Sequence, residues 1–238
     1  MNFTKTNKSK EYFRILILRI IGNFLILSSL FMIGKTFYQP AKEEVRYFVN
    51  QYFNKKYVVK TDKMTFKIDQ NNNQPKGGLA KLLNVKPFEV LTPEYPEFSI
   101  VVPKIGANAK ILPNIDPTDD KIYLEALKHG VAHAQGTVFP GEGGHIFLFA
   151  HSTDYIWNVS YYNAVFYLLY KLEKEDEVNI FYKGQRYVYR VTDKTVVDPS
   201  QVEYLTRKSN REFLTLQTCW PPGTTLKRLL IFAVRKSE

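Results

Sequence analysis

The stretch that decides the fold lies near the end of the chain and reads Phe213-Leu-Thr-Leu-Gln-Thr-Cys-Trp-Pro-Pro-Gly-Thr-Thr-Leu-Lys-Arg-Leu-Leu-Ile-Phe-Ala-Val234. Two apolar runs flank a Pro-Pro-Gly turn, which is typical of two neighbouring extended segments. The first run ends near Cys219, the only cysteine of the sequence, and the second opens with Arg228. We therefore expect a thiol and a fixed positive charge on adjacent segments, which can form a catalytic site if a histidine joins them.

Short apolar runs separated by turns also fill the chain upstream of this stretch. The pattern predicts a mainly β fold, a closed or nearly closed barrel of about eight strands with short helices, over residues 91–238. The expected strands are Phe98–Val102, Ala109–Leu112, His145–His151, Glu177–Tyr182, Arg186–Val191, Thr195–Val197, Phe213–Cys219 and Arg228–Val234. The expected helical pieces are Ile122–Lys128, stopped by Gly130, and about Tyr162–Leu172.

The N-terminal part has a different composition. Phe13–Ile33 is dominated by Ile, Leu and Phe, and as a helix it is roughly 31 Å long, enough to span a bilayer. We divide this part into a cytoplasmic tail (1–12), a transmembrane anchor (13–37) and an extracytoplasmic stalk with a short helix (38–90), flexible near Asn71–Gly78. Lysines precede the apolar segment, which predicts a cytoplasmic N-terminus and a single pass. A cleaved signal peptide and a buried soluble helix are the alternatives.

The formal charge of +10 should attract anions, such as lipid head groups, acidic cell-wall polymers or nucleic acid. A solvated lysine-rich surface is the other interpretation. No zinc-ligand spacing, phosphate-binding glycine loop or RNA-binding aromatic signature accompanies the charge, so we expect no nucleic-acid partner. A single cysteine excludes an internal disulfide, and in an exported protein it indicates a functional thiol or an intermolecular link.

Four histidines are candidates for the partner of the cysteine. His129 follows a helical piece and His133 lies in a turn region, whereas His145 and His151 bracket one strand with about 20 Å between them. His145 and His151 are therefore not expected to share a metal ion, and we predict no metal site. His151 ends its strand beside a polar loop, which suits a catalytic base or acid for a thiol nucleophile. Taken alone, a structural cysteine, a capping histidine and a surface arginine explain the same residues.

Ordered motifs decide between these interpretations, because several of them together resemble the sortase family. Thr215-Leu216-Gln217-Thr218-Cys219 followed by Arg228-Leu229-Leu230 is similar to its Thr-Leu-x-Thr-Cys and Arg-Leu-[Leu/Ile]-Val signatures. Upstream matches, in the family's order, are Ile100–Gly106, Gly130–His133, Gly136-Thr137, Pro140–Gly144 and Phe149–Ser152.

The resemblance implies a membrane-anchored cysteine transpeptidase with a β-barrel core. Cys219 is implied as the nucleophile that attacks a Leu-Pro-x-Thr-Gly-like (LPxTG-like) sorting signal, and His151 as the acid and base. Arg228 is implied to hold the substrate and stabilise the oxyanion, together with the backbone N–H after the cysteine. Thr218 and Trp220 are implied to bind substrate. The implied partners are surface proteins bearing the signal and an amine acceptor, either a cell-wall precursor or a pilin lysine.

The sequence departs from the family at two positions, with His145 where Asn is usual and Ala150 where Gly is usual. No Asp-Pro-Trp lid motif precedes the barrel, which argues against a lidded pilin-polymerising enzyme. We expect no cofactor, although the acidic run Glu173–Glu177 leaves calcium as an alternative to a solvated loop. Two other functions stay open: a catalytically inactive membrane-anchored barrel that binds or assembles surface proteins, and another Cys-dependent hydrolase or L,D-transpeptidase, whose usual Ser-x-Gly-Cys context is missing.

Overall fold

The computed structural model of the chain describes residues 3–53, 55–59, 88–152 and 165–236. The chain divides into two compact units, Met1–Lys42 and Glu43–Glu238. Helix α1 (Phe3–Tyr52) makes up the described part of the first unit and continues into the second. Within it, Glu11–Lys35 is long and apolar enough to cross a membrane, with a mean hydropathy of 2.2. Pro40 lies inside this helix, so the short helix predicted for the stalk is the continuation of α1 and not a separate element.

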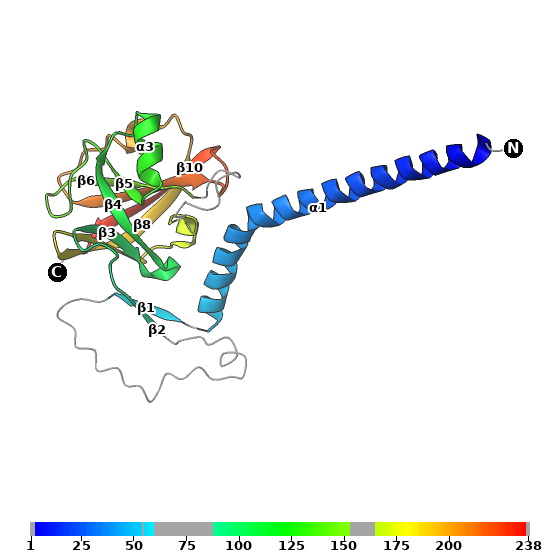
Figure 1. The fold of residues 1–238 in the computed structure, drawn as a ribbon. Helices are drawn as coiled ribbons and strands as arrows, with labels where there is room; N and C mark the ends of the chain where they lie inside the picture. The colour runs from blue at the N-terminus through cyan, green and yellow to red at the C-terminus, as the bar shows by residue number, and fades with distance from the viewer. Residues whose placement is uncertain (1–2, 54, 60–87, 153–164, 237–238) are drawn as a thin grey trace. The chain divides into compact units, whose positions relative to one another are not determined.

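Eight strands of the second unit close into a barrel (Figure 1), which confirms the predicted fold class. The order around the barrel is β10-β8-β7-β3-β4-β5-β6-β9. The strands are β3 (Phe98–Val102), β4 (Ala107–Ile115), β5 (Val131–Ala134), β6 (His145–Phe149), β7 (Glu177–Tyr182), β8 (Gln185–Val197), β9 (Phe213–Trp220) and β10 (Lys227–Arg235). Two neighbour pairs, β4 with β5 and β6 with β9, run parallel, and the other six are antiparallel.

Strand alternation sorts the side chains of β6 and β9 into an inner and an outer face. On β6, Ile146 and Leu148 belong to the main core inside the barrel, and on β9, Leu214 and Leu216 do the same. The intervening Phe147 points outward, into a second apolar cluster that also includes residues of α3 and of the connection between β8 and β9. The outer face of β6 and β9 is therefore covered by other elements.

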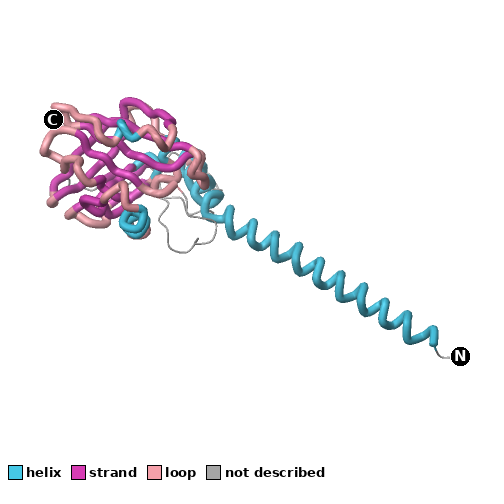
Figure 2. Tube along the Cα trace, turned by 90° about the horizontal axis from the view of Figure 1, so that it is seen from above, coloured by secondary structure: helices cyan, strands magenta, loops and turns pink. Residues whose placement is uncertain are grey.

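Two elements provide that cover. Helix α3 (Asp120–Leu127) packs beside β4 and β5 (Figure 1). Figure 2 shows the short helices at the edge of the strands. Its N-cap, Asp119, accepts hydrogen bonds from two backbone N–H groups of the first turn, which stabilises the start of the helix. The connection between β8 and β9 contains the 3₁₀-helix η3 (Val202–Tyr204).

Three predicted elements differ from the structure. Residues 131–134, which we interpreted as a turn, form β5, and all four of its residues are buried. The two strands predicted in residues 186–197 are one strand, β8, in which Thr192 is the extra residue of a bulge opposite β10, and the bulge interrupts the alternation that sequence reading relies on. The helix predicted near residues 162–172 is absent from its described part, 165–172, which contains turns and the 3₁₀-helix η2 (Leu169–Lys171).

The region predicted as a stalk contributes a small sheet. Strands β1 (Lys56–Val59) and β2 (Phe88–Leu91) pair in parallel, and Val59 and Leu91 pack against Val101 of β3 and Phe181 of β7. The segment Asn71–Gly78, which we expected to be flexible, lies outside the described residues. The predicted division at residues 37 and 90 stays a prediction.

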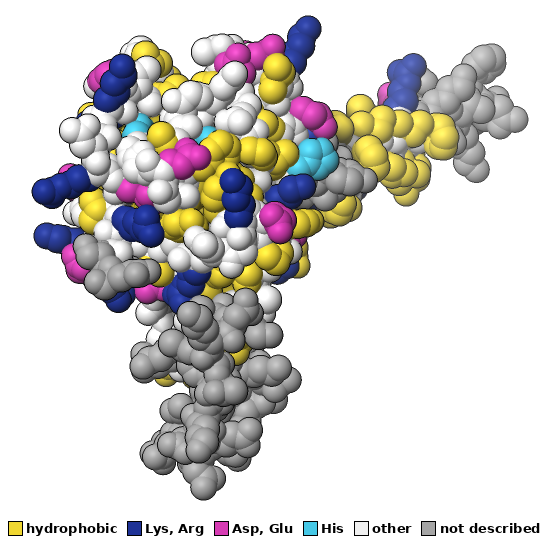
Figure 3. Space-filling model, turned by 90° about the vertical axis from the view of Figure 1, so that its left-hand side faces the viewer, with side chains coloured by type: hydrophobic (Ala, Val, Ile, Leu, Met, Phe, Trp, Pro, Cys, Tyr) yellow, Lys and Arg dark blue, Asp and Glu magenta, His cyan; other side chains and the backbone are white. Residues whose placement is uncertain are grey.

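Charged side chains are mixed on the surface of the barrel unit. Figure 3 shows Lys and Arg interspersed with Asp and Glu across one face. Exposed ion pairs are present, such as Lys227 with Asp198 at 2.6 Å and Lys128 with Glu125 at 2.6 Å. Pairs of this exposed kind contribute little to stability, roughly 0–1 kcal/mol each.

Candidate active site

The register of the two C-terminal strands brings the thiol and the guanidinium together. In the antiparallel pairing of β9 with β10, Cys219 lies directly opposite Arg228. Side chains of directly opposed residues leave the same face of a sheet. The sequence predicted that the thiol and the guanidinium lie on adjacent segments. The β9–β10 register makes Cys219 and Arg228 a cross-strand pair on the outer face of the barrel.

His151 reaches the same place from the other neighbour of β9. The strands β6 and β9 pair in parallel, and each residue of β6 faces the β9 residue 68 positions later, from His145 opposite Phe213 to Phe149 opposite Gln217. His151 and Cys219 are each two residues beyond the last of these pairs and keep the same spacing. Both side chains line one pocket together with Arg228.

Backbone and side-chain hydrogen bonds continue the link between β6 and β9 beyond the paired residues. The Ala150 N–H donates to the Gln217 carbonyl oxygen at 3.1 Å. The Thr218 hydroxyl then donates to the Ala150 carbonyl oxygen at 3.0 Å. Because Thr218 is only 3% exposed, this bond is shielded from water, and it fixes the peptide that immediately precedes His151 relative to the residue that precedes Cys219.

Burial controls the protonation of the pair. Desolvation raises the pKa of the half-buried Cys219 thiol above its ordinary value of 9.0, and the Arg228 charge opposes this by lowering it. Desolvation also lowers the pKa of His151 below 6.5. Near neutral pH both groups are therefore mainly uncharged, a thiol beside an imidazole that can accept its proton.

The pocket around these residues has a volume of about 300 Å³. Helix α3 forms one wall, with Tyr123, Leu124 and Leu127, and the β8–β9 connection forms another with Val202 and Leu205. The loop between β9 and β10 adds Gly223, Thr224 and Thr225. Arg228 is oriented by this loop, because its guanidinium donates to the carbonyl oxygens of Thr225 at 3.0 Å and Lys227 at 3.1 Å.

Sequence reasoning missed Tyr123 as a residue of the site. Its ring packs edge-on against Phe149, with 6.2 Å between the ring centres. Burial raises the pKa of Tyr123, Asp120 raises it further, and the charge of Arg228 lowers it. The Tyr123 hydroxyl therefore stays protonated at neutral pH. The signal available in the sequence was the spacing of Tyr123 and Leu127, which places both on one side of a helix.

The two residues predicted to bind substrate occupy different positions. Thr218 contributes to the pocket lining, although its hydroxyl is engaged by Ala150. Trp220 is not part of that lining: its side chain packs against the main core and pairs with the ring of Tyr170 at 5.4 Å. Their substrate contacts stay predictions.

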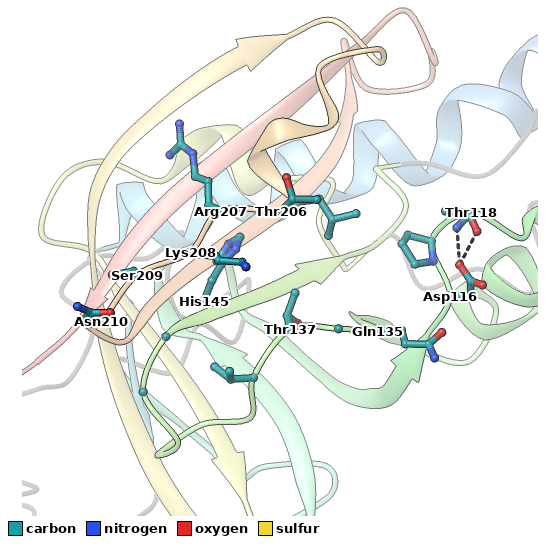
Figure 4. Close-up of a pocket in the computed structure, with 16 residues that line it drawn as sticks. Asp116, Thr118, Gln135, Thr137, His145, Thr206, Arg207, Lys208, Ser209 and Asn210 are labelled. Atoms are coloured by element: carbon teal, nitrogen blue, oxygen red, sulfur yellow. Dashed lines mark hydrogen bonds between the residues drawn. The ribbon is translucent and has the colours of Figure 1, made fainter.

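A larger, open hollow of about 960 Å³ adjoins the pocket, sharing Pro117 and Leu205 with it. Figure 4 shows His145 in this hollow, with Thr206–Asn210 of the β8–β9 connection on one side and Asp116, Thr118 and Gln135 on the other.

His145 is built into this part of the outer face. Its ring stacks on Phe213 at 4.2 Å, and its Nε2 lies 2.9 Å from the Thr215 hydroxyl. Burial lowers the pKa of His145 to about 4, so the ring is neutral at neutral pH.

The other two histidines are also accounted for by local contacts. His133 is fully buried on β5, where its Nδ1 accepts a hydrogen bond from the Asn114 N–H and its Nε2 lies 3.1 Å from the Val138 carbonyl oxygen. His129 is exposed and lies 3.4 Å from a Glu125 carboxylate oxygen.

The acidic run Glu173–Glu177 is engaged by basic side chains. Lys104 Nζ lies 2.9 Å from a Glu173 oxygen and 2.8 Å from an Asp176 oxygen. Within the part of the chain that the structure describes, no three His, Cys, Asp or Glu residues come together as metal ligands would.

Comparison with known proteins agrees with this geometry. The sortase domain family matches residues 100–236, which include every residue of the pocket. Sortase D of Bacillus subtilis (strain 168) is 28% identical over 137 residues, covering 56% of this chain and 61% of the relative's own length.

Solved structures of sortases are also similar to this chain. Sortase C-1 from Actinomyces oris is 32% identical, with a TM-score of 0.50, covering 61% of this chain and 76% of that one. A pilus-related sortase C of Group B Streptococcus is 28% identical, with a TM-score of 0.50, covering 59% of this chain and 67% of that one.

Proposed function

The chain belongs to the sortase family, and from this premise we propose that it is a membrane-anchored cysteine transpeptidase that cleaves an LPxTG-like sorting signal and transfers the protein to an amine. The observation that carries the proposal is the convergence of three side chains on one pocket: Cys219 opposite Arg228, and His151 in register with Cys219 across the parallel pair.

The first half-reaction forms a thioester. The Cys219 Sγ attacks the threonine carbonyl carbon of the signal, and its proton passes to His151. The carbonyl becomes an oxyanion, which the Arg228 guanidinium stabilises from the adjacent strand. The C–N bond then breaks, and His151 returns the proton to the leaving amine. The acyl fragment, which ends in the threonine carbonyl, stays bound to Cys219 as a thioester.

The second half-reaction reverses the roles. An acceptor amine attacks the thioester, His151 takes its proton, and the thiol leaves and is reprotonated. The high pKa of Cys219 and the low pKa of His151 keep both groups neutral before substrate binds. Proton transfer therefore accompanies attack, and the partly enclosed pocket excludes some of the water that would otherwise hydrolyse the thioester.

The location and partners of the protein follow from the same proposal. The apolar helix Glu11–Lys35 would hold the enzyme in the cell membrane with its N-terminus in the cytoplasm. Surface proteins bearing the sorting signal would be the acyl donors, and a cell-wall precursor or a pilin lysine would be the acceptor. Thr218 and Trp220 would contact or support the bound signal, and the reaction as proposed requires no metal or cofactor.

The test is direct detection of the thioester. The full chain in detergent micelles is mixed with a panel of fluorogenic LPxTG-like peptides, with and without a soluble amine, and intact-mass spectrometry records acylation at Cys219. We expect a thioester with at least one peptide, transfer to the amine, and loss of both in Cys219→Ala and His151→Ala. His129→Ala is the matched control, because that histidine is exposed and is not among the residues that line the pocket, and it should retain activity. Full activity in Cys219→Ala would refute the proposal.

A further inference from the structure

A cluster of side chains lies on the opposite side of β9 from Cys219, and of its members only Trp220 has been given a part in the proposed reaction. It consists of Glu44 and Tyr47 from the end of α1, Tyr170 and Lys171 from η2, and Trp220 from β9; we call it the Tyr170 cluster. All five residues lie in the second compact unit, Glu43–Glu238. Trp220 is covalently bonded to Cys219, so the cluster is one residue away from the nucleophile.

The segment that carries Tyr170 is rigidly held by the core. Phe166, Leu169 and Leu172 are fully buried in the main apolar cluster of the barrel. Lys194 of β8 adds two hydrogen bonds of 2.9 Å, to the carbonyl oxygens of Tyr170 and Leu172. The backbone on both sides of Tyr170 is therefore fixed, and its side chain projects from a rigid support.

One side of Tyr170 is bound by the N-terminal helix. Its hydroxyl donates a short hydrogen bond to one oxygen of the Glu44 carboxylate. The other Glu44 oxygen lies 3.3 Å from Lys171 Nζ, and that ammonium group lies over the rings of Tyr170 and Tyr47, 4.8 and 5.2 Å from their centres. Each polar group of this arrangement has a partner of complementary charge or dipole.

The other side of Tyr170 holds the end of β9. Its ring packs at a tilt against the Trp220 ring, with 5.4 Å between their centres, a distance and geometry at which aromatic pairs attract each other. Trp220 is also where the β9–β10 loop begins, and residues of that loop, Gly223, Thr224 and Thr225, line the catalytic pocket. Fixing the Trp220 side chain thus fixes the residue that is bonded to the nucleophile and from which the pocket-lining loop starts.

We infer that Tyr170 is a positioning residue for Cys219, which holds Trp220 in place and is itself held by Glu44 at the end of the N-terminal helix. The inference rests on the proposed function, because it concerns the placement of the nucleophile of that reaction. It also assigns a role to the part of α1 that follows the apolar span: this part supports the active site through Glu44. An error of about 1 Å in the position of a reacting group can cost roughly 100-fold in rate, so a loose Trp220 should slow attack by Cys219.

The experiment separates Tyr170's two contacts in the full chain in detergent micelles. Tyr170→Phe removes the hydroxyl bound by Glu44 and keeps a ring against Trp220, whereas Tyr170→Ala removes both. A Trp157→Phe background leaves Trp220 as the single tryptophan. The matched control is Tyr182→Ala, which deletes two aromatic pairs of similar spacing, 5.1 Å to Phe98 and 5.1 Å to Phe139. Tyr182 lies on β7, which is not a neighbour of β9 in the barrel.

Three quantities are measured for each variant: the single-turnover rate of thioester formation with its KM, the emission maximum of Trp220, and the melting temperature. For Tyr170→Ala we expect the acylation rate to fall about tenfold, KM to change less than about twofold, and Trp220 emission to move to longer wavelength. Tyr170→Phe keeps the ring against Trp220 and loses the bond to Glu44, so it should acylate at a rate between those of the parent and Tyr170→Ala and keep the parent emission. A parent-like rate would show that Glu44 has no part in the positioning. Tyr182→Ala should lower the melting temperature with no change in rate per folded molecule.

The inference is overturned if Tyr170→Ala acylates as fast as the control once the folded fraction is counted, or if Tyr170→Phe is as slow as Tyr170→Ala. Failure of the proposed function has a different signature, since no variant and no parent enzyme would then form a thioester. In that event Trp220 emission and the rate of Cys219 alkylation by iodoacetamide still test the link: both should change in Tyr170→Ala and not in Tyr182→Ala, and equal values in these two variants would overturn it.

Discussion

Replacing Thr218 by valine tests whether the bond between Thr218 and Ala150 aligns the histidine with the cysteine. Valine has nearly the same shape as threonine, so the substitution leaves no cavity and removes one hydroxyl group. That hydroxyl donates at 3.0 Å to the Ala150 carbonyl oxygen, and Thr218 is 3% exposed. The carbonyl next to His151 would therefore lose a buried donor that water cannot readily replace.

The magnitude follows from the burial of this bond. Leaving a buried acceptor without its donor costs about 1–3 kcal/mol. For a domain of this size, about 2 kcal/mol lowers the melting temperature by roughly 4–8 °C. We also expect thioester formation to slow about tenfold, which corresponds to about 1.4 kcal/mol in the barrier, because the peptide preceding His151 is no longer fixed to β9.

The assay compares Thr218→Val with Thr218→Ser in the full chain, by thermal unfolding and by single-turnover acylation. Serine keeps the hydroxyl and loses one methyl group, worth about 0.8 kcal/mol. We expect both variants to be destabilised but only the valine variant to be slow. The reasoning is refuted if Thr218→Val melts within about 1 °C of the parent and acylates at the same rate, or if serine is as slow as valine.

Three further predictions concern charge, pH and packing. Arg228→Met should shift the pH profile of Cys219 alkylation by iodoacetamide to higher pH, since the arginine charge lowers the thiol pKa that burial raises, while Arg228→Lys should largely restore the parent profile. Between pH 6.5 and about 4 the unfolded chain binds a proton at His145 that the folded chain does not. The free energy of unfolding therefore falls by about 3 kcal/mol as pH decreases through this range, and His145→Asn should reduce this loss in acid unfolding. Gly130→Ala should lower the free energy of unfolding by at least about 2 kcal/mol in denaturant titrations, because its Cβ would lie 2.4 Å from the Lys110 carbonyl oxygen; a parent-like midpoint would contradict this.

The parts of the fold that could be predicted are the strands rich in β-branched and aromatic residues and bounded by turn residues. The limits of β3 and β7 agree with the predicted Phe98–Val102 and Glu177–Tyr182. β5 was missed because it is only four residues long, two of them alanines, which have a low strand propensity, and because a glycine precedes it. The helix predicted near residues 162–172 failed because a 3₁₀ turn buries the same apolar residues as a helix would.

Part of the site could also be predicted, and strand geometry explains which part. Successive side chains of a strand point to opposite faces, and the structure accordingly places Cys219 in the pocket and packs Trp220 against the main core. Strand periodicity alone predicts these opposite directions. By contrast, Tyr123 and Tyr170 approach β9 from elements nearly 100 and 50 residues earlier in the sequence, and no local pattern indicates that they meet it.

The placement of His151 and Cys219 in one pocket depends on the register between β6 and β9. Each of these two residues lies at or near the end of a strand. The local sequence does not indicate that the two strands are neighbours, that they run parallel, or that paired residues are 68 positions apart. Once the barrel places β6 beside β9, every interstrand pair in this ladder has that spacing, and the proposed catalytic pair, His151 and Cys219, extends it by two residues. A shift of one residue in either strand would turn its terminal side chain to the opposite face. The thiol and the imidazole are therefore brought together by the register of the barrel, which the Thr218–Ala150 bond holds in place at the point where the pairing of β6 and β9 ends.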